Sequence, residues 1–368
     1  MKIERIELRE FTMPMKTPFE TSFGVTQARR MILVAVSSGG LTGYGEVSCN
    51  ETPGYSYETT DTAWVMLNDF FAPAVIGKEL HRPEDFAGFM KPFRGASVRQ
   101  KRVSSWHCGD LWARAANQPL WKFIGGTKTE LPVGLSIGIK SSPEALAEFV
   151  TEQKALGYRR LKLKIGRGRD VQFVKAAREA IGFDTNLTVD ANSDYTLGDI
   201  DLLRELDQYK LQYIEQPLEN DDIVDHATLA RSLETPLCLD EPIHALSDVR
   251  KAHALGSGKV INLKIGRVGG HTESHRIAAF CAEHGIDLWC GGMLESGVGR
   301  AHNVALQTLS AFTLASDTAP SARYWAEDII EPEITMHDGI TKPLDGIGLG
   351  VTLKHDLIER LTTRVQVF

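Results

Sequence analysis

The chain of 368 residues contains few cysteines, and none of its five cysteines is spaced as a CxxC pair. A sparse, odd-numbered set excludes a disulfide framework and a zinc knuckle, so we expect reduced and mostly buried thiols. Positive charge is also limited, because 41 lysines and arginines face 48 acidic residues, a net charge of −7. The chain therefore lacks the basic surface expected of a protein that binds nucleic acid or an anionic membrane.

Long hydrophobic runs are also missing. Apolar stretches such as Met31 to Val36 are far too short to span a bilayer, and Lys2, Glu4 and Arg5 place charges where a signal peptide would need its apolar region. We therefore expect a cytoplasmic protein. No GxGxxG or Walker sequence occurs, which argues against a doubly wound nucleotide-binding sheet. With 42% hydrophobic and 24% charged residues, the composition is that of a globular protein.

The first third of the chain differs from the remainder. Residues 2–12 and 31–37 predict β-strands, and residues 57–71 and 98–117 predict helices. The paired glycines Gly125 and Gly126 end the second helical pattern and mark a boundary. We therefore expect an α+β unit in this part of the chain.

From Leu131 onward, short apolar segments alternate with amphipathic helical segments, which is typical of βα units around a parallel sheet. Eight such units predict an α/β fold of the TIM barrel type. The predicted strands are residues 133–138, 161–165, 187–192, 213–216, 237–241, 260–265, 287–290 and 313–317.

Five successive units each finish with one charged residue. These residues follow one another at intervals of 26, 25, 25 and 24 positions, and they are Lys164, Asp190, Glu215, Asp240 and Lys264. The C-terminal ends of barrel strands carry catalytic residues in enzymes of this fold. A single lysine or aspartate at such a place is usually a solvated loop residue, but five in register are difficult to explain in that way.

Strand periodicity predicts where these side chains point. In residues 161–165 leucines alternate with Lys162 and Lys164, so both lysines face the barrel axis. The same alternation turns Asn262 and Lys264 inward, and it places Asp190 on the face of Asn192. We therefore expect a charged cluster at the mouth of the barrel.

Three converging carboxylates repel one another unless a cation compensates them. Hard oxygen ligands favour Mg²⁺, with Mn²⁺ as a substitute, and predict Asp190, Glu215 and Asp240 as metal ligands. Asn192 and Glu241 are candidates for contacts behind these ligands. A neighbouring cation and partial desolvation favour a neutral lysine, so we expect Lys164 to be the general base, with Lys162 as the cation beside it.

These residues resemble the enolase superfamily, and more closely its muconate-lactonizing subgroup. The resemblance covers essentially the whole chain and rests on the KxK pair, the three acids and the further lysine, in the order of the family. It implies a modified TIM (β/α) barrel with an α+β capping domain, and proton abstraction next to the carboxylate of a small-molecule substrate. It assigns residues 1–125 to the capping domain, 126–320 to the barrel and 321–368 to a segment that packs back on the capping domain.

Other stretches resemble the o-succinylbenzoate synthases and N-acylamino acid racemases of this subgroup. These are residues 19–24, 291–297 and 321–325. The resemblance implies a lid in which Phe19 and Phe23 exclude water, and it adds contacts to the substrate or to the residues around it from Gly292, Met293, Glu295, Asn262, Asp317 and Arg267. Asp317 is followed by Thr-Ala, whereas dipeptide epimerases carry Asp-x-Asp, which counts against a dipeptide substrate. Residues 104–110 depart from the family pattern.

Two reactions use the same charged residues. One is a Mg²⁺-dependent β-elimination of water that yields o-succinylbenzoate for menaquinone biosynthesis. The other is racemisation of N-succinylamino acids, in which Lys164 and Lys264 act on opposite faces of one carbon, and the resemblance of Arg267 keeps it open. A Schiff-base aldolase would not need three registered acids, and a non-catalytic scaffold would need none. The resemblance also implies a homo-oligomer.

Overall fold

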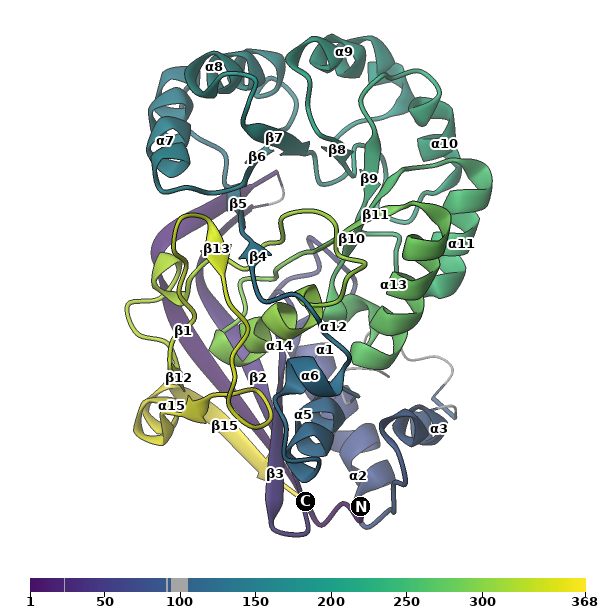
Figure 1. Ribbon diagram of the computed structural model, residues 1–368, viewed down its shortest axis with the longest axis vertical. Coiled ribbons are helices and arrows are strands. Elements are labelled where there is room, and N and C mark those ends of the chain that lie inside the picture. The colour runs from purple at the N-terminus through teal and green to yellow at the C-terminus, as the bar shows by residue number, and fades with distance from the viewer. Residues whose placement is uncertain (23, 91, 94–104) are drawn as a thin grey trace.

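Two sheets of different construction organise the chain (Figure 1). The computed structural model describes residues 1–22, 24–90, 92–93 and 105–368. A four-stranded antiparallel sheet is formed mainly by the N-terminal part, and a seven-stranded parallel sheet is formed by the middle of the chain. This arrangement agrees with a modified barrel that carries a separate capping unit.

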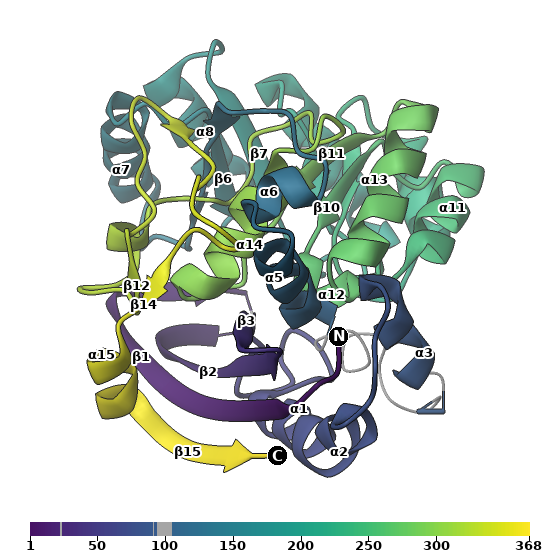
Figure 2. The ribbon, with the colours of Figure 1, turned by 60° about the horizontal axis from the view of Figure 1, so that its bottom comes forward.

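The antiparallel sheet has the strand order β15-β1-β2-β3, formed by β1 (Arg5–Thr21), β2 (Gly24–Ser38), β3 (Leu41–Val47) and β15 (Thr362–Val367). β15 lies beside β1, so the end of the chain returns to its beginning (Figure 2). One face of the sheet packs its alternate apolar residues against nearby helices. These helices are α1 (Thr60–Val65), the π-helix η1 (Met66–Phe71), α2 (Ala72–Val75), α3 (Phe86–Met90) and α5 (Ser105–Ala115).

The parallel sheet runs in the order β11-β10-β9-β8-β7-β6-β5. Its strands are β5 (Gly134–Ile137), β6 (Arg160–Lys164), β7 (Asn186–Asp190), β8 (Ile214–Glu215), β9 (Leu237–Leu239), β10 (Val260–Leu263) and β11 (Asp287–Cys290). Helices cover its outer side (Figure 1). The helices of this part are α6 (Leu120–Phe123), α7 (Pro143–Ala155), α8 (Val171–Ile181), α9 (Ile200–Glu205), α10 (Val224–Ala230), α11 (Leu246–Leu255), α12 (Ile265–Val268), α13 (His271–His284) and α14 (Gly297–Gln307).

Local sequence signals explain where several helices begin. The hydroxyls of Ser142 and Ser296 accept hydrogen bonds from the first turns of α7 and α14, which satisfies N–H groups that lack a partner in the helix. On β6 and β7 the outward residues are leucine or valine, and they are buried in the core beneath the helices. The alternate positions face the interior of the barrel.

The predicted eighth strand at residues 313–317 is the main correction. The segment forms no regular strand, because its side chains replace part of the backbone ladder: Leu288 N and Cys290 N of β11 donate to Thr313 Oγ1 and Ser316 Oγ instead of to backbone carbonyls. Leu314 N and Asp317 N donate to carbonyls of β11, whereas Gly134 N of β5 donates to Ser316 O. The segment therefore closes the gap between the first and last parallel strands with isolated bonds rather than a continuous ladder.

The tail adds three short strands and one helix, β12 (Ile330–Glu331), β13 (Ile340–Thr341), β14 (Thr352–Leu353) and α15 (His355–Leu361). β12 pairs with β14, and β13 pairs with β4 (Leu131–Pro132). The predicted helix at residues 98–117 is present in its described part as α5, whereas its residues up to Ser104 lie outside the described residues. Phe23, a predicted lid residue, also lies outside them. None of the helices in the described ranges has the length and apolarity to cross a membrane.

Candidate active site

The structure brings the five registered charges together at the C-terminal end of the parallel strands. The predicted acids Asp190, Glu215 and Asp240 are buried. Lys162 Nζ lies 2.8 Å from Glu215 Oε2 and 3.2 Å from Asp190 Oδ2, and Lys164 Nζ donates to Asp190 Oδ2 at 2.6 Å. Since these residues come from three adjacent strands, the barrel register alone creates the cluster.

Asp240 anchors the other side of the cluster. Lys264 Nζ donates to Asp240 Oδ2 at 2.9 Å, and Arg267 Nη1 lies 2.5 Å from Asp240 Oδ1. Tyr55, from the segment between β3 and α1, inserts its hydroxyl here. It donates to Asp240 Oδ2 at 3.0 Å and accepts from Lys264 Nζ at 2.6 Å. The capping unit thus reaches directly into the barrel mouth.

Burial and mutual repulsion perturb the acids of the cluster. Burial, together with the neighbouring Asp190, raises the pKa of Glu215 to about 7. Burial and the charges of Asp240 and Asp190 raise the pKa of Glu241 to about 8. Burial also acts to raise the pKa of Asp240, but Arg267 and Lys264 overcome it and hold this pKa well below its usual range. The cations that contact the cluster compensate Asp240 most strongly, whereas burial keeps the pKa values of Glu215 and Glu241 raised.

The donor set fits a hard divalent cation. In the part of the chain that the structure describes, no group of three or more His, Cys, Asp or Glu side chains stands ready to hold a metal ion, since ammonium and guanidinium groups contact the acids instead. Glu241 Oε2 is nevertheless buried without a hydrogen-bond partner among the described residues. Carboxylate oxygens are the ligands that Mg²⁺ prefers, and a bound cation would favour the ionised form of these buried acids.

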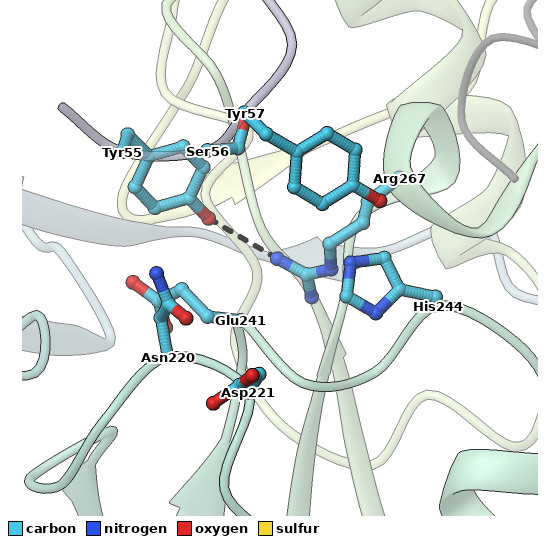
Figure 3. A pocket seen from close by; sticks show the side chains of 8 residues that line it. All are labelled: Tyr55, Ser56, Tyr57, Asn220, Asp221, Glu241, His244 and Arg267. Atoms are coloured by element: carbon cyan, nitrogen blue, oxygen red, sulfur yellow. Dashed lines mark hydrogen bonds between the residues drawn. The ribbon is translucent and has the colours of Figure 1, made fainter. Parts of the chain in front are cut away.

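Two cavities adjoin the cluster. The first, of about 70 Å³, is lined by the predicted catalytic lysines Lys164 and Lys264, by Asn192, and by residues of the capping unit and of the loop after β11, namely Phe19, Thr21, Thr26, Asn50, Tyr55, Gly292, Met293 and Leu294. The second, of about 140 Å³, is also lined by Tyr55. Figure 3 shows it, with the Tyr55 hydroxyl directed at Arg267 and Glu241 nearby.

Strained backbone gathers around the first cavity. Asn192, Ser193, Gln216 and Leu294 adopt positive φ values of 44°, 66°, 38° and 55°. Such conformations cost about 1–3 kcal/mol each in non-glycine residues and persist where the surroundings enforce them, often at functional sites. One consequence is that Asn192 donates to Glu241 Oε1 at 3.0 Å and accepts from Lys164.

Three predicted contact residues do not line either cavity. Asn262 lies inside the barrel and donates to Glu215 Oε1 at 2.7 Å. Asp317 accepts hydrogen bonds from Arg160 and Ser136. Glu295 accepts from Met293 N at 2.5 Å and from Asn303, so it holds the loop that carries Gly292 and Met293. These residues support the cavity wall from behind.

Sequence reasoning missed two features of the site. Tyr55 lies in an irregular segment, where no periodic signal predicts its direction. Arg160 could have been found, because it shares the inward face of β6 with Lys162 and Lys164. Its partner Tyr213 precedes β8 and faces Arg160 across the barrel interior.

A buried carboxylate joins the capping sheet to the loop of the active site. Glu46, on β3, accepts hydrogen bonds from Ser296 N at 3.1 Å and from Ser296 Oγ at the start of α14. Burial raises the pKa of Glu46 to about 7, although the Ser296 hydroxyl opposes this shift, and the neighbouring Glu295 adds to it. Its contacts fix the end of the segment that carries Met293 and Leu294.

We expect Glu46→Gln to stabilise the protein at pH 8 and to lose this advantage by pH 5. An acid whose folded pKa is raised from 4.5 to about 7 contributes its full stability below pH 4.5 and loses it as the pH rises to about 7. A rise in pKa of this size corresponds to a change of about 3 kcal/mol, across this pH range, in the difference in unfolding free energy between variant and wild type. Urea unfolding at the two pH values measures it, and a difference that does not vary with pH contradicts the raised pKa.

Comparison with known proteins gives matches over the whole chain. Residues 5–125 match the family described as mandelate racemase / muconate lactonizing enzyme, N-terminal domain, and residues 145–357 match the enolase C-terminal domain-like family. An N-succinylamino acid racemase of Thermus thermophilus is 45% identical, covering 98% of both chains. An o-succinylbenzoate synthase of Geobacillus kaustophilus is 44% identical, covering 100% of this chain and 98% of the relative. The crystal structure of an enolase superfamily member from Listeria innocua, 36% identical, superposes with a TM-score of 0.95 and covers 100% of this chain and 99% of that one.

Proposed function

The chain belongs to the mandelate racemase / muconate lactonizing enzyme family of the enolase superfamily, and from this premise we propose that it is a Mg²⁺-dependent o-succinylbenzoate synthase. The reaction is a β-elimination of water from a cyclohexadiene carboxylate through an enolate. In this proposal residues 126–320 carry the chemistry, while residues 1–125 and 321–368 cap the site. Relatives that carry this activity in their names match the chain from end to end.

The observation that carries the proposal is the pair of lysines that line one cavity. Lys164 and Lys264 both line the cavity, and each donates to a different buried acid. A substrate carbon held between them would have one amine on each side. This arrangement suits proton removal next to a carboxylate, which needs a base and a group that stabilises the developing negative charge.

Each residue then has a chemical task. Asp190, Glu215 and Asp240 would hold Mg²⁺, which when bound supplies a Lewis acid for the substrate carboxylate. Lys164 Nζ takes the α-proton, and Lys264, as an ammonium, stabilises the enolate. The β carbon–oxygen bond then breaks, and the proton on Lys164 passes to the departing hydroxide, so that water leaves and Lys164 is neutral again. Phe19 and Met293, on the cavity wall, would help to exclude solvent.

A second activity, N-succinylamino acid racemisation, is favoured by the same two lysines. With bases on both faces of the α-carbon, one lysine removes the proton and the other returns a proton from the opposite side. The racemase relative at 45% identity supports this alternative. Racemisation would use the same metal ligands as the elimination and would differ in that either lysine can act as the base.

Replacing Lys264 by alanine is expected to leave hydrogen exchange at only one face of the substrate α-carbon. In D₂O with Mg²⁺, the wild type should incorporate deuterium at the α-carbon of both enantiomers of an N-succinylamino acid. The Lys264→Ala variant should exchange only the enantiomer whose proton faces Lys164, and racemisation should fall by about 10²-fold or more. Proton NMR measures both rates, and equal exchange of both enantiomers by the variant would contradict the opposed bases.

The decisive assay of the proposed function compares the two reactions side by side. Purified protein with Mg²⁺ should form o-succinylbenzoate from its cyclohexadiene precursor, monitored by absorbance. Failure to form this product while N-succinylamino acids are racemised would leave the second activity as the function. Turnover of neither substrate would refute both.

A further inference from the structure

Charged side chains, rather than the branched aliphatic residues usual in such barrels, fill the interior below the candidate active site. Arg160, Lys162 and Lys164 project from β6 at alternate positions, so Arg160 lies deepest. Its side chain is fully buried, with 0% exposed. A guanidinium at this depth costs free energy unless its charge is compensated. Its Nε has no hydrogen-bond partner among the described residues, so its two terminal nitrogens make the contacts that compensate the charge.

Arg160 sits in a fitted pocket. Its Nη1 donates to the hydroxyl of Tyr213 at 2.6 Å, its Nη2 donates to Asp317, and its guanidinium carbon lies 4.4 Å from the centre of a Trp289 ring. On the neighbouring strand β5, a Cβ at Gly134 would lie 2.3 Å from Arg160 Nη2. Only glycine at position 134 leaves room for the guanidinium, so the residues on β5 and β6 fit each other at this point.

Asp317 connects Arg160 to the layer above. Its Oδ1 accepts from Arg160, whereas its Oδ2 accepts from Ser136 Oγ at 2.8 Å and lies 3.7 Å from Lys162 Nζ. Burial acts to raise the pKa of Asp317, but Lys162 and Arg160 overcome it and hold the pKa at about 2, so this carboxylate is ionised. Lys162 thus lies within 4 Å of three acids, Asp317, Glu215 and Asp190.

The Lys162 ammonium lies closer to Glu215 and Asp190 than to Asp317. Its Nζ is 2.8 Å from Glu215 and 3.2 Å from Asp190, both predicted metal ligands, compared with 3.7 Å from Asp317. Because Arg160 neutralises Asp317, the electrostatic attraction of the Lys162 ammonium to Asp317 is weak. If that compensation were lost, Asp317 would be an unpaired buried charge, and Lys162 would be the nearest cation able to approach it.

We infer that Arg160 is a positioning residue, which by pairing with Asp317 keeps the Lys162 ammonium beside Glu215 and Asp190 under the metal and substrate sites. This inference rests on the proposed function for its catalytic consequence, but not for its effect on the metal site. The other guanidinium near the cluster, Arg267, acts from the opposite side through Asp240.

Replacement of Arg160 by methionine tests this role, because it moves two measurements in opposite directions. With Lys162 drawn toward Asp317, the metal site loses a competing cation, so Mg²⁺ should bind about tenfold more tightly. Turnover should fall by about tenfold, since the ammonium leaves its place beside the reacting groups. Calorimetric titration with MgCl₂ gives the first value, and steady-state kinetics with the cyclohexadiene precursor and with an N-succinylamino acid gives the second.

A second substitution should reverse both effects. In Arg160→Met/Asp317→Asn the charge that attracts Lys162 is absent, so Lys162 should again lie beside Glu215 and Asp190. Both Mg²⁺ affinity and kcat should therefore approach the wild-type values. If the single methionine variant does not fold, Arg160→Gln, which keeps a donor for Asp317 but removes the charge, provides the same comparison. The matched control is Arg178→Met, which removes another buried guanidinium, bonded to backbone carbonyls of Tyr209, Gly182, Thr185 and Lys210. It should lower Tm without changing Mg²⁺ affinity or kcat.

Two results would overturn the inference. If the Arg160 variant binds Mg²⁺ less tightly, turns over more slowly and is not rescued by Asp317→Asn, Arg160 serves only the structure of the barrel. If neither quantity changes, Arg160 does not position Lys162. The calorimetric measurement needs no substrate, so it decides the inference even if the wild type turns over neither substrate, a result that would refute the proposed function alone.

Discussion

Replacement of Lys164 by alanine is expected to abolish turnover of both candidate substrates, with a fall in kcat of about 10³-fold or more. The reason is that Lys164 is the predicted base, it lines the cavity, and its Nζ is held by Asp190 and Asn192 at the end of β6. Alanine has no group that could accept the α-proton. Stopped assays with prolonged incubation measure the residual rate.

The same variant should keep its response to metal. Alanine at position 164 removes a cation from Asp190 and none of the predicted ligands, so the Mg²⁺-dependent rise in Tm should persist or increase. Lys175→Ala is the matched control, because Lys175 is 60% exposed on α8, 3.9 Å from Glu179. It should behave as wild type in both measurements. Turnover retained by Lys164→Ala would contradict the assigned base.

Replacement of Glu215 by glutamine is expected to abolish both metal binding and turnover. Glu215 is the middle of the three predicted ligands, and glutamine preserves its shape and an oxygen that can accept from Asn262. Losing the charge should weaken Mg²⁺ binding by at least about 100-fold, since even groups behind metal ligands contribute 10- to 100-fold to affinity. The Mg²⁺-dependent rise in Tm should therefore disappear, as calorimetry and thermal unfolding can show.

A comparison without metal separates this effect from damage to the fold. The Tm of Glu215→Gln in EDTA should remain close to that of the wild type, because Lys162 keeps its ion pair with Asp190, and removing a buried charge that Asp190 repels offsets the loss of the Lys162–Glu215 pair. Glu205→Gln, an exposed position on α9, provides the matched control and should leave the Mg²⁺ response intact. A Glu215→Gln protein that keeps its full Mg²⁺-dependent stabilisation would show that this carboxylate is not a ligand.

The prediction for residues 19–24 shows what local sequence patterns can and cannot predict. The resemblance predicts a lid, and Phe19 does line the cavity, but Phe19 to Thr21 belong to β1 and pair with Thr26, Val25 and Gly24 of β2. The described residues on either side of position 23 therefore end a long hairpin, and the lid stays a prediction. Local composition predicts strands and turns, whereas the length of a hairpin depends on cross-strand pairing that is not visible along one strand.

The sequence by itself determined the family, the βα alternation and the register of the five charged residues. It could do so because each βα unit has nearly the same length, and because a strand with one buried face must alternate its residues with a period of two. These regularities survive in a single sequence. They also explain why the inward direction of Lys162 and Lys164 could be predicted without coordinates.

Only the tertiary structure decided what the charges contact. Tyr55 reaches Asp240 across 185 positions, Arg160 reaches Asp317 across 157 positions, and Glu46 reaches Ser296 across 250. Irregular segments carry no periodic signal, and a pairing over such separations depends on how the capping unit and the barrel pack together. The grouping of the charged residues was therefore predictable from spacing, whereas the network of contacts around them follows from packing alone.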